Sequence, residues 1–463
     1  MGNPPDDLYE YLKRKGHVLI KGDAGTGKTT LALELLRMLG VGGKGVYLST
    51  RVSPSELYAQ FPWLEEIVKP EHMVSTTYAP DETKFDDIRL GDAKYILEKV
   101  LDAREALKTP VIVFDTWDGL AKEIEEKERA KIEKTIMVIL DASDASAIFV
   151  SEEPMKTTID YLVDGIVILS QSELDGRRIR DIELNKLRGK RISHHRLLFT
   201  LNDGRFRCFP PYERKTIEKT RKWKPVPDSK DYFSTGSEDL DKILGGGYPR
   251  GSYVVLEADA NVPISARGDV TYSVIRNFLS QNRGVTCFPI GGSSSGVIES
   301  YVAPYIERKR LNKYLRIYEI ANGGKGQAKP HIVPLSAEAD MDKDYKLWIE
   351  TQDELRERTG QQLLKSYGLD TLESRYIEAP EKLFKVVGLD IINCIAMGGL
   401  VLSVGSSGLT ITHRAVNMAE VHLRMVKRCG SIIIYGVKPE TVLNVLETDV
   451  SMGYPKIRLT PIA

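Results

Sequence analysis

The sequence has few of the features that mark secreted, zinc-binding or strongly charged proteins. Its four cysteines (Cys208, Cys287, Cys394 and Cys429) lie far apart without CxxC spacing, so neither a zinc site nor a disulfide framework is supported. Sixty-five basic residues balance sixty-five acidic ones, so the chain has no net positive charge that would attract nucleic acid or anionic lipid. The first residues contain no apolar signal core, and we expect a cytoplasmic protein.

A membrane span is also not indicated. The apolar stretch 386–404 approaches the length of a span, but Asp390, Asn393 and three glycines interrupt it. We interpret it as two buried parallel strands joined by a turn, the first of them ending at Asp390.

The length of 463 residues predicts two or three domains, and 42% hydrophobic with 28% charged residues is typical of a soluble globular chain. From residue 17, short β-branched runs alternate with amphipathic stretches at 28–39 and 117–140. This alternation predicts an α/β fold with parallel strands and crossover helices. The expected strands are HVLIKG, GVYLST, VIVFDT, SAIFVSE and GIVILSQ, followed by a closing hairpin from Arg196.

Two similar halves are separated by a basic segment. We expect a first domain at 1–209, a proline-flanked linker at 210–231 and a second domain at 232–463. YVVLEADANVPISA in the second half aligns with HVLIKGDAGTGKTT in the first. A later strand of the second half matches one of the first half only if the second half contains an insertion, which we place near 301–381. The basic linker around Trp223 could touch nucleic acid, but a packed or solvated linker is the preferred interpretation.

The strongest motif is a phosphate-binding loop that follows a strand and begins a helix. Glycines let successive backbone N–H groups converge on phosphate oxygens, and the helix N-terminus adds positive potential. Lys28 supplies a cation for the β and γ phosphates, Thr29 can ligate Mg²⁺, and Thr30 is placed to reach the α phosphate. The nucleotide-binding residues are Gly22, Asp23, Ala24, Gly25, Thr26, Gly27, Lys28, Thr29 and Thr30.

An acidic residue at a neighbouring strand end completes this site. VIVFDTWD places Asp115 directly after four apolar residues, at the sheet edge where α/β proteins bind ligands. We assign Asp115, with Thr29, to a Mg²⁺ shell, so that ATP and Mg²⁺ are the predicted cofactors. For Asp118, three residues on, we favour an N-cap role for the following helix.

The order GDAGTGKTT, GVYLST, VIVFDT and NKLRGKR resembles RecA-superfamily ATPases of the KaiC-like branch. YLSTRVSPSEL is most similar to the D group of archaeal gas-vesicle regulators within that branch. The resemblance covers nearly the whole chain and implies two tandem RecA/KaiC-like P-loop domains with mainly parallel central sheets, the second degenerate.

The same resemblance implies contacts between subunits. KaiC-like modules carry a K-x-R-G signature whose cations reach the nucleotide of the neighbouring subunit, and Lys186 and Arg188 match it. Side chains alternate along a strand, so both would project from one side and could clamp a γ phosphate. A homo-oligomer is therefore expected.

The chain departs from the family pattern in two places. Arg51 stands where the family has water-activating glutamates, and a guanidinium cannot act as a base, although it could hold a phosphate. Glu152 and Glu153 are candidate substitutes, and slow hydrolysis is expected. In the second domain Ile264 replaces the lysine and Pro263 removes an N–H donor, so we expect no ordinary nucleotide site there.

Together these features predict an ATP-binding protein, a slow ATPase that acts as a nucleotide-dependent regulator or assembly switch through contacts with an unidentified protein partner. The alternative is a recombinase-paralogue DNA-binding ATPase that assists DNA repair, with a steep salt dependence of DNA affinity as its signature. The neutral overall charge favours the switch. Autokinase activity is a third possibility, but it requires an acceptor Ser or Thr that the sequence does not identify.

Overall fold

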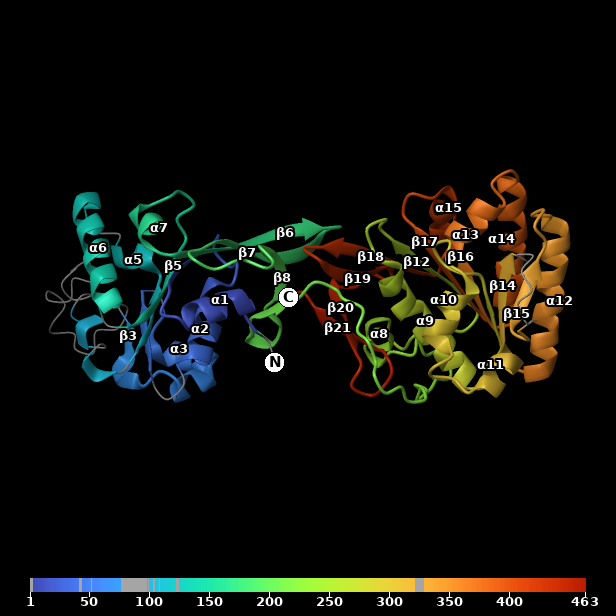
Figure 1. Ribbon diagram of the computed structural model, residues 1–463, viewed down its shortest axis with the longest axis horizontal. Coiled ribbons are helices and arrows are strands. Elements are labelled where there is room, and N and C mark those ends of the chain that lie inside the picture. Colours follow the sequence, from blue (N-terminus) through green and yellow to red (C-terminus); the bar gives the residue numbers. More distant parts are fainter. Residues whose placement is uncertain are drawn as a thin grey trace. The chain divides into compact units, whose positions relative to one another are not determined.

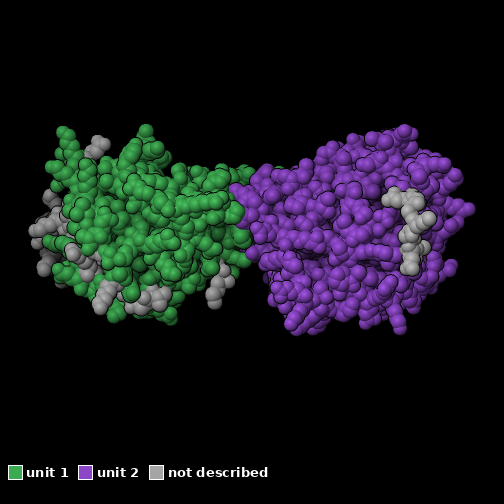
Figure 2. All heavy atoms as spheres, viewed as in Figure 1, with its two compact units in different colours: residues 1–210, 462–463 green, residues 211–461 purple. Residues whose placement is uncertain are grey.

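A computed structural model describes residues 3–40, 44–50, 52–75, 98, 100–102, 105–107, 109–121, 125–142, 144–320 and 329–463. The chain divides into two compact units, one of residues 1–210 with 462–463 and one of residues 211–461 (Figure 2).

The first unit contains a nine-stranded mixed sheet in the order β3-β2-β4-β5-β1-β6-β7-β8-β9. The strands from β3 to β6 in this order are parallel, and those from β6 to β9 pair antiparallel, which includes the predicted hairpin. The strands are β1 (His17–Lys21), β2 (Gly45–Ser49), β3 (Met73–Ser75), β4 (Val111–Asp115), β5 (Ser146–Ser151), β6 (Gly165–Leu174), β7 (Arg177–Leu187), β8 (Arg196–Thr200) and β9 (Arg207–Phe209).

Helices cover both faces of this sheet, because its central strands are apolar on both sides. Helices α1, α2 and α3 pack on one face, and α5, α6 and α7 on the other (Figure 1). The stretch at 117–140 that we expect to be helical is two helices, α5 and α6. The helices are α1 (Asp6–Leu12), α2 (Lys28–Leu39), α3 (Pro54–Gln60), α5 (Trp117–Ala121), α6 (Glu126–Ala142) and α7 (Thr158–Leu162), with 3-10 turns η1 (Pro62–Glu66), η2 (Pro70–His72) and η3 (Asn202–Gly204).

The second unit contains a ten-stranded sheet in the order β15-β14-β13-β16-β17-β12-β18-β19-β20-β21, parallel from β15 to β18 and antiparallel beyond. A short pair, β10 (Tyr232–Phe233) and β11 (Tyr248–Pro249), forms a separate ladder. The sheet strands are β12 (Ser252–Ala258), β13 (Val285–Cys287), β14 (Leu315–Ile320), β15 (Ile332–Leu335), β16 (Leu364–Gly368), β17 (Leu400–Ser406), β18 (Val421–Arg428), β19 (Ser431–Lys438), β20 (Asn444–Asp449) and β21 (Lys456–Pro461).

The helices of the second unit again form two layers. Helices α8 to α11 pack on one face of the sheet and α12 to α15 on the other (Figure 1). They are α8 (Glu238–Ile243), α9 (Ile264–Ser280), α10 (Ser295–Val302), α11 (Arg308–Tyr314), α12 (Met341–Thr359), α13 (Leu369–Arg375), α14 (Pro380–Ala396) and α15 (Thr410–Met418).

The two sheets share one topology. The order β2-β4-β5-β1-β6 in the first unit corresponds to β13-β16-β17-β12-β18 in the second, with the same parallel pairing. This confirms the predicted α/β class with two tandem RecA-like units.

The predicted strand ending at Asp390 is wrong. Asp390 lies in α14, and only the end of the stretch 386–404 is a strand, β17. The strand that corresponds to β4 is β16, inside the region where we place an insertion. The exposed polar residues Glu381, Lys382 and Lys385 of α14 come before position 386, whereas the exposed positions within the stretch include Leu389 and Ile392, which weakens the helical pattern there. Among the described residues, no helix combines the length and the apolar composition needed to cross a bilayer.

From Pro211 onward, the segment that we expect to be a linker belongs to the second unit. Its Trp223 is buried in that unit's core, where its ring lies 4.9 Å from that of Tyr454 and its backbone N–H donates to Tyr305 O at 2.9 Å. This tryptophan therefore packs inside the unit, while the neighbouring Lys222 and Lys224 are exposed.

Candidate functional site

The glycine-rich loop connects β1 to α2, as its motif predicts, and Lys28 is the first residue of the helix. Gly25 and Gly27 have φ values of 76° and 100°, which favour glycine over residues with a side chain. A Cβ atom on Gly22 would lie 2.5 Å from Leu169 O, and one on Gly27 would lie 2.8 Å from Leu201. The loop therefore needs its glycines both for conformation and for close packing.

Lys28 is held within the loop that it belongs to. The residue is 5% exposed, and its Nζ donates to Asp23 O at 2.8 Å. The Nζ also lies 3.4 Å from Glu152 Oε1, at the end of β5. Thr26 Oγ1 donates to the same Asp23 carbonyl at 2.8 Å, which braces the turn. The cation that would meet phosphate is thus paired with a carboxylate of its own chain.

Thr29 and Asp115 lie together beside the helix start. Thr29 Oγ1 donates to Asp115 Oδ2 at 2.7 Å, because parallel β4 ends at the same sheet edge as β1. Hydroxyl and carboxylate oxygens are ligands that Mg²⁺ accepts, so this pair fits the ion. Tyr47 OH donates to the same Oδ2 at 2.5 Å. Burial and the charge of Asp115 raise the pKa of Tyr47 well above its ordinary value, so Tyr47 remains a proton donor.

Tyr47 is a site residue that the sequence reasoning missed. Its only signal is a phenol in the centre of the apolar strand GVYLS, where a buried hydroxyl needs a partner. A cavity of about 360 Å³ opens beside these residues. Its lining includes Ala24, Gly25, Gly27, Lys28, Thr29, Thr30, Tyr47, Asp115 and Glu152.

The two candidate glutamates after β5 have different positions. Glu152 lies at the lysine of the loop, whereas Glu153 is exposed and its N–H donates to Ser151 Oγ at 3.1 Å. Glu153 lines a second cavity of about 780 Å³, and Glu152 contributes to the walls of both cavities. The structure therefore brings one of the two carboxylates to the phosphate-loop lysine.

Lys186 and Arg188 line the second cavity. Lys186 lies in β7, and its Nζ donates to Val163 O at 2.6 Å. Arg188 follows the end of β7, and its NH1 pairs with Asp164 at 2.7 Å while 68% of the side chain is exposed. The strand ends at Leu187, so only Lys186 lies within it, contrary to the expectation that one strand carries both.

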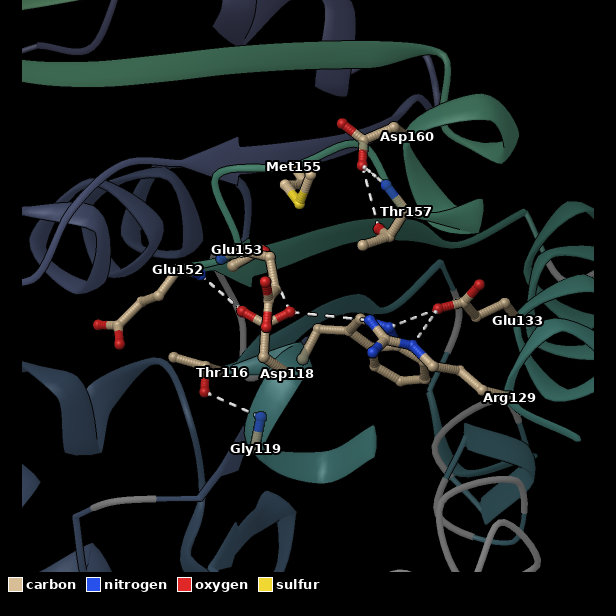
Figure 3. A network of polar contacts seen from close by, with 12 residues as sticks. Thr116, Asp118, Gly119, Arg129, Glu133, Glu152, Glu153, Met155, Thr157 and Asp160 are labelled. Atoms are coloured by element: carbon tan, nitrogen blue, oxygen red, sulfur yellow. Dashed lines mark hydrogen bonds and ion pairs between the residues drawn. The ribbon is translucent and has the colours of Figure 1, made fainter. Parts of the chain in front are cut away.

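The predicted N-cap role of Asp118 is wrong. Helix α5 begins at Trp117, so Asp118 is already inside its first turn. Its carboxylate instead accepts hydrogen bonds from Glu152 N at 2.6 Å and Ser151 Oγ at 3.0 Å (Figure 3). Arg51, a predicted phosphate contact, lies outside the described residues.

A buried ion pair, also missed from the sequence, stands directly before the loop. Lys21 Nζ donates to both oxygens of Asp160, at 3.0 and 3.2 Å, and to Met155 O at 2.8 Å. Asp160 Oδ2 also accepts from the Thr157 N–H at 2.8 Å. A lysine ending an apolar strand is a visible signal, but its partner 139 positions away is not.

The corresponding loop of the second unit is filled by its own chain. Helix α9 begins at Ile264, at the position of Lys28, after the N-cap Pro263. Arg267, 5% exposed, donates from NH1 to Ser406 Oγ at 3.0 Å and from NH2 to Asp259 O at 3.2 Å. Its NH1 also lies 3.4 Å from Asp370 Oδ2. A guanidinium with protein partners therefore lies beside this loop.

Comparisons with known proteins agree with this division of the chain. The ATPase family described as KaiC matches residues 6–212, and the family described as GvpD basic region 2 matches residues 222–463. Protein GvpD1 of Halobacterium salinarum is 27% identical, with 96% of this chain and 93% of its own length covered. Protein GvpD2 of the same organism is 26% identical, over 96% and 92%. The circadian clock oscillator protein KaiC of Prochlorococcus marinus is 24% identical, over 51% and 49%.

Proposed function

Since the chain belongs to the GvpD family and joins a KaiC-type ATPase domain to GvpD basic region 2, we propose that its first unit binds ATP and uses it as a regulatory switch. The nucleotide state then controls assembly of the protein or its contact with a protein partner.

The observation that carries this proposal is the meeting of three groups at one sheet edge. Lys28 lies at the start of α2, and the Thr29 hydroxyl is 2.7 Å from the Asp115 carboxylate. Loop N–H groups and Lys28 would hold the phosphates, and Thr29 with Asp115 would hold Mg²⁺. When bound, Mg²⁺ neutralises charge on the phosphate oxygens.

Hydrolysis is proposed to be slow. Glu152 is the carboxylate best placed to orient water, yet it is paired with Lys28 at 3.4 Å, and triphosphate must compete for that lysine. We therefore expect turnover toward or below about 1 per second, the lower end of common values. A protein that holds triphosphate for long suits a switch better than a motor.

The second unit is proposed to bind no nucleotide. Ile264 offers no cation, Pro263 offers no N–H, and Arg267 is engaged by Asp370, Ser406 and the Asp259 carbonyl. This unit then serves for protein contacts. The number of nucleotide sites per chain tests this difference between the two units.

Calorimetry with a non-hydrolysable ATP analogue tests the proposal. We expect about one nucleotide site per chain, formed by the phosphate loop of the first unit, and Lys28→Ala should remove most of the binding. The matched control is Lys134→Ala, which removes an exposed lysine of α6 and should bind as the wild type does. A stoichiometry near two, or unchanged binding in Lys28→Ala, would contradict the assignment of the site.

A further inference from the structure

A chain of polar contacts ends at the backbone of Glu152, whose carboxylate points away from Asp118 (Figure 3). Asp118 accepts the Glu152 N–H at 2.6 Å with Oδ2 and the Ser151 hydroxyl at 3.0 Å with Oδ1. Hydrogen bonds to a carboxylate are shorter and stronger than those between neutral groups. One carboxylate thus fixes the backbone where β5 ends.

Asp118 is itself held by a chain of partners. Arg129 NH2 lies 3.7 Å from Asp118 Oδ1, and Arg129 Nε donates to Glu133 Oε1 at 3.0 Å. The Trp117 indole donates to the same Glu133 oxygen at 2.8 Å, and Glu133 is 1% exposed. The turn that supplies Asp115 to the candidate metal site therefore also supplies Trp117 and Asp118.

We propose that Asp118 is a positioning residue for Glu152. It fixes the Glu152 backbone so that the Glu152 carboxylate stays at Lys28, at the wall shared by the two cavities. Through this position Glu152 competes with the γ phosphate for Lys28, and this part rests on the proposed nucleotide site.

A purely local role for Asp118 does not account for these contacts. Its carboxylate accepts hydrogen bonds from Ser151 and Glu152, which belong to a different part of the chain from helix α5. Its partners Ser151 and Glu152 are the last residue of β5 and the first beyond it, where the chain turns past Lys28. The contact therefore fixes the backbone position of Glu152, whose carboxylate lies beside Lys28.

Hydrogen exchange of the nucleotide-free full chain tests the positioning step. In Asp118→Ala the amides at 152–157 should exchange at least about tenfold faster, because a charge-assisted hydrogen bond is lost. Amides of β1 and α2 should not change. Asp118→Asn, which keeps an oxygen acceptor, should have a smaller effect, and Glu128→Ala on the exposed side of α6 serves as the control. Unchanged exchange in folded Asp118→Ala would overturn the proposal.

Binding measurements test the link to the γ phosphate. The ratio of the ADP and ATP-analogue dissociation constants should rise about threefold in Glu152→Gln, as for a partly exposed ion pair, and by a similar factor in Asp118→Ala. The double variant should match Glu152→Gln alone, because both changes act on one contact. Additive effects would overturn the coupling. If the wild type bound neither nucleotide, the proposed function would fail, and hydrogen exchange would still decide whether Asp118 fixes Glu152.

Discussion

Replacing Lys21 by methionine should destabilise the first unit strongly. The Lys21 and Asp160 side chains are 10% and 6% exposed, and the pair joins the strand before the phosphate loop to the start of α7. Methionine keeps much of the apolar stem of the lysine but leaves a buried carboxylate without its cation.

The magnitude follows from the contacts that remain. Removing one partner of a buried ion pair typically lowers the free energy of unfolding by ~3–5 kcal/mol. Asp160 retains hydrogen bonds from Thr157 N and Oγ1, at 2.8 and 3.0 Å, so we expect the lower end, about 3 kcal/mol. The double variant Lys21→Met/Asp160→Asn removes both charges, and its loss should be smaller, under about 2 kcal/mol.

Hydrogen exchange in increasing urea provides the assay, because it reports the two units separately and a two-unit chain need not unfold in one step. Peptides of the first unit should lose protection at lower urea in Lys21→Met, whereas peptides of the second unit should be unaffected. A single variant as stable as the wild type, or a double variant less stable than the single one, would refute the reasoning.

Three further predictions concern assembly, the metal site and the thiols. Lys186→Ala/Arg188→Ala should weaken ATP-dependent self-association, measured by sedimentation with and without ATP and Mg²⁺, and an unchanged mass distribution would exclude a clamp between subunits. Tyr47→Phe should lower the free energy of unfolding of the first unit by about 1–2 kcal/mol in urea denaturation, because Asp115 loses a buried donor. Burial raises the pKa of Cys287 to about 12 and that of Cys394 to about 11, so at pH 8 both remain thiols and should resist a charged thiol reagent until the chain unfolds. Rapid labelling of either in the native protein would contradict this burial.

The phosphate loop could be predicted from sequence because its chemistry is local. The strand, the turn from Gly22 to Gly27 and the helix beginning at Lys28 are contiguous, so spacing alone places the glycines, the cation and the hydroxyl. Asp115 is predicted in a similar way, from four apolar residues that end in an acid. The second loop is also interpreted by residue type, and α9 begins at Ile264, the residue aligned with Lys28.

The tertiary structure decided the contacts between distant segments. The sheet order β4-β5-β1 brings the ends of three strands together, and only this places Glu152 rather than Glu153 at Lys28 and aims Asp118 at β5. The sequence favours a strand at the position of α14 because the exposed positions after residue 386 include the apolar Leu389 and Ile392, so the hydrophobic periodicity of a helix is weak over this stretch. Lys21 and Asp160 form their ion pair where burial removes water as a competitor. This burial depends on the packing of distant segments, which no local sequence pattern encodes.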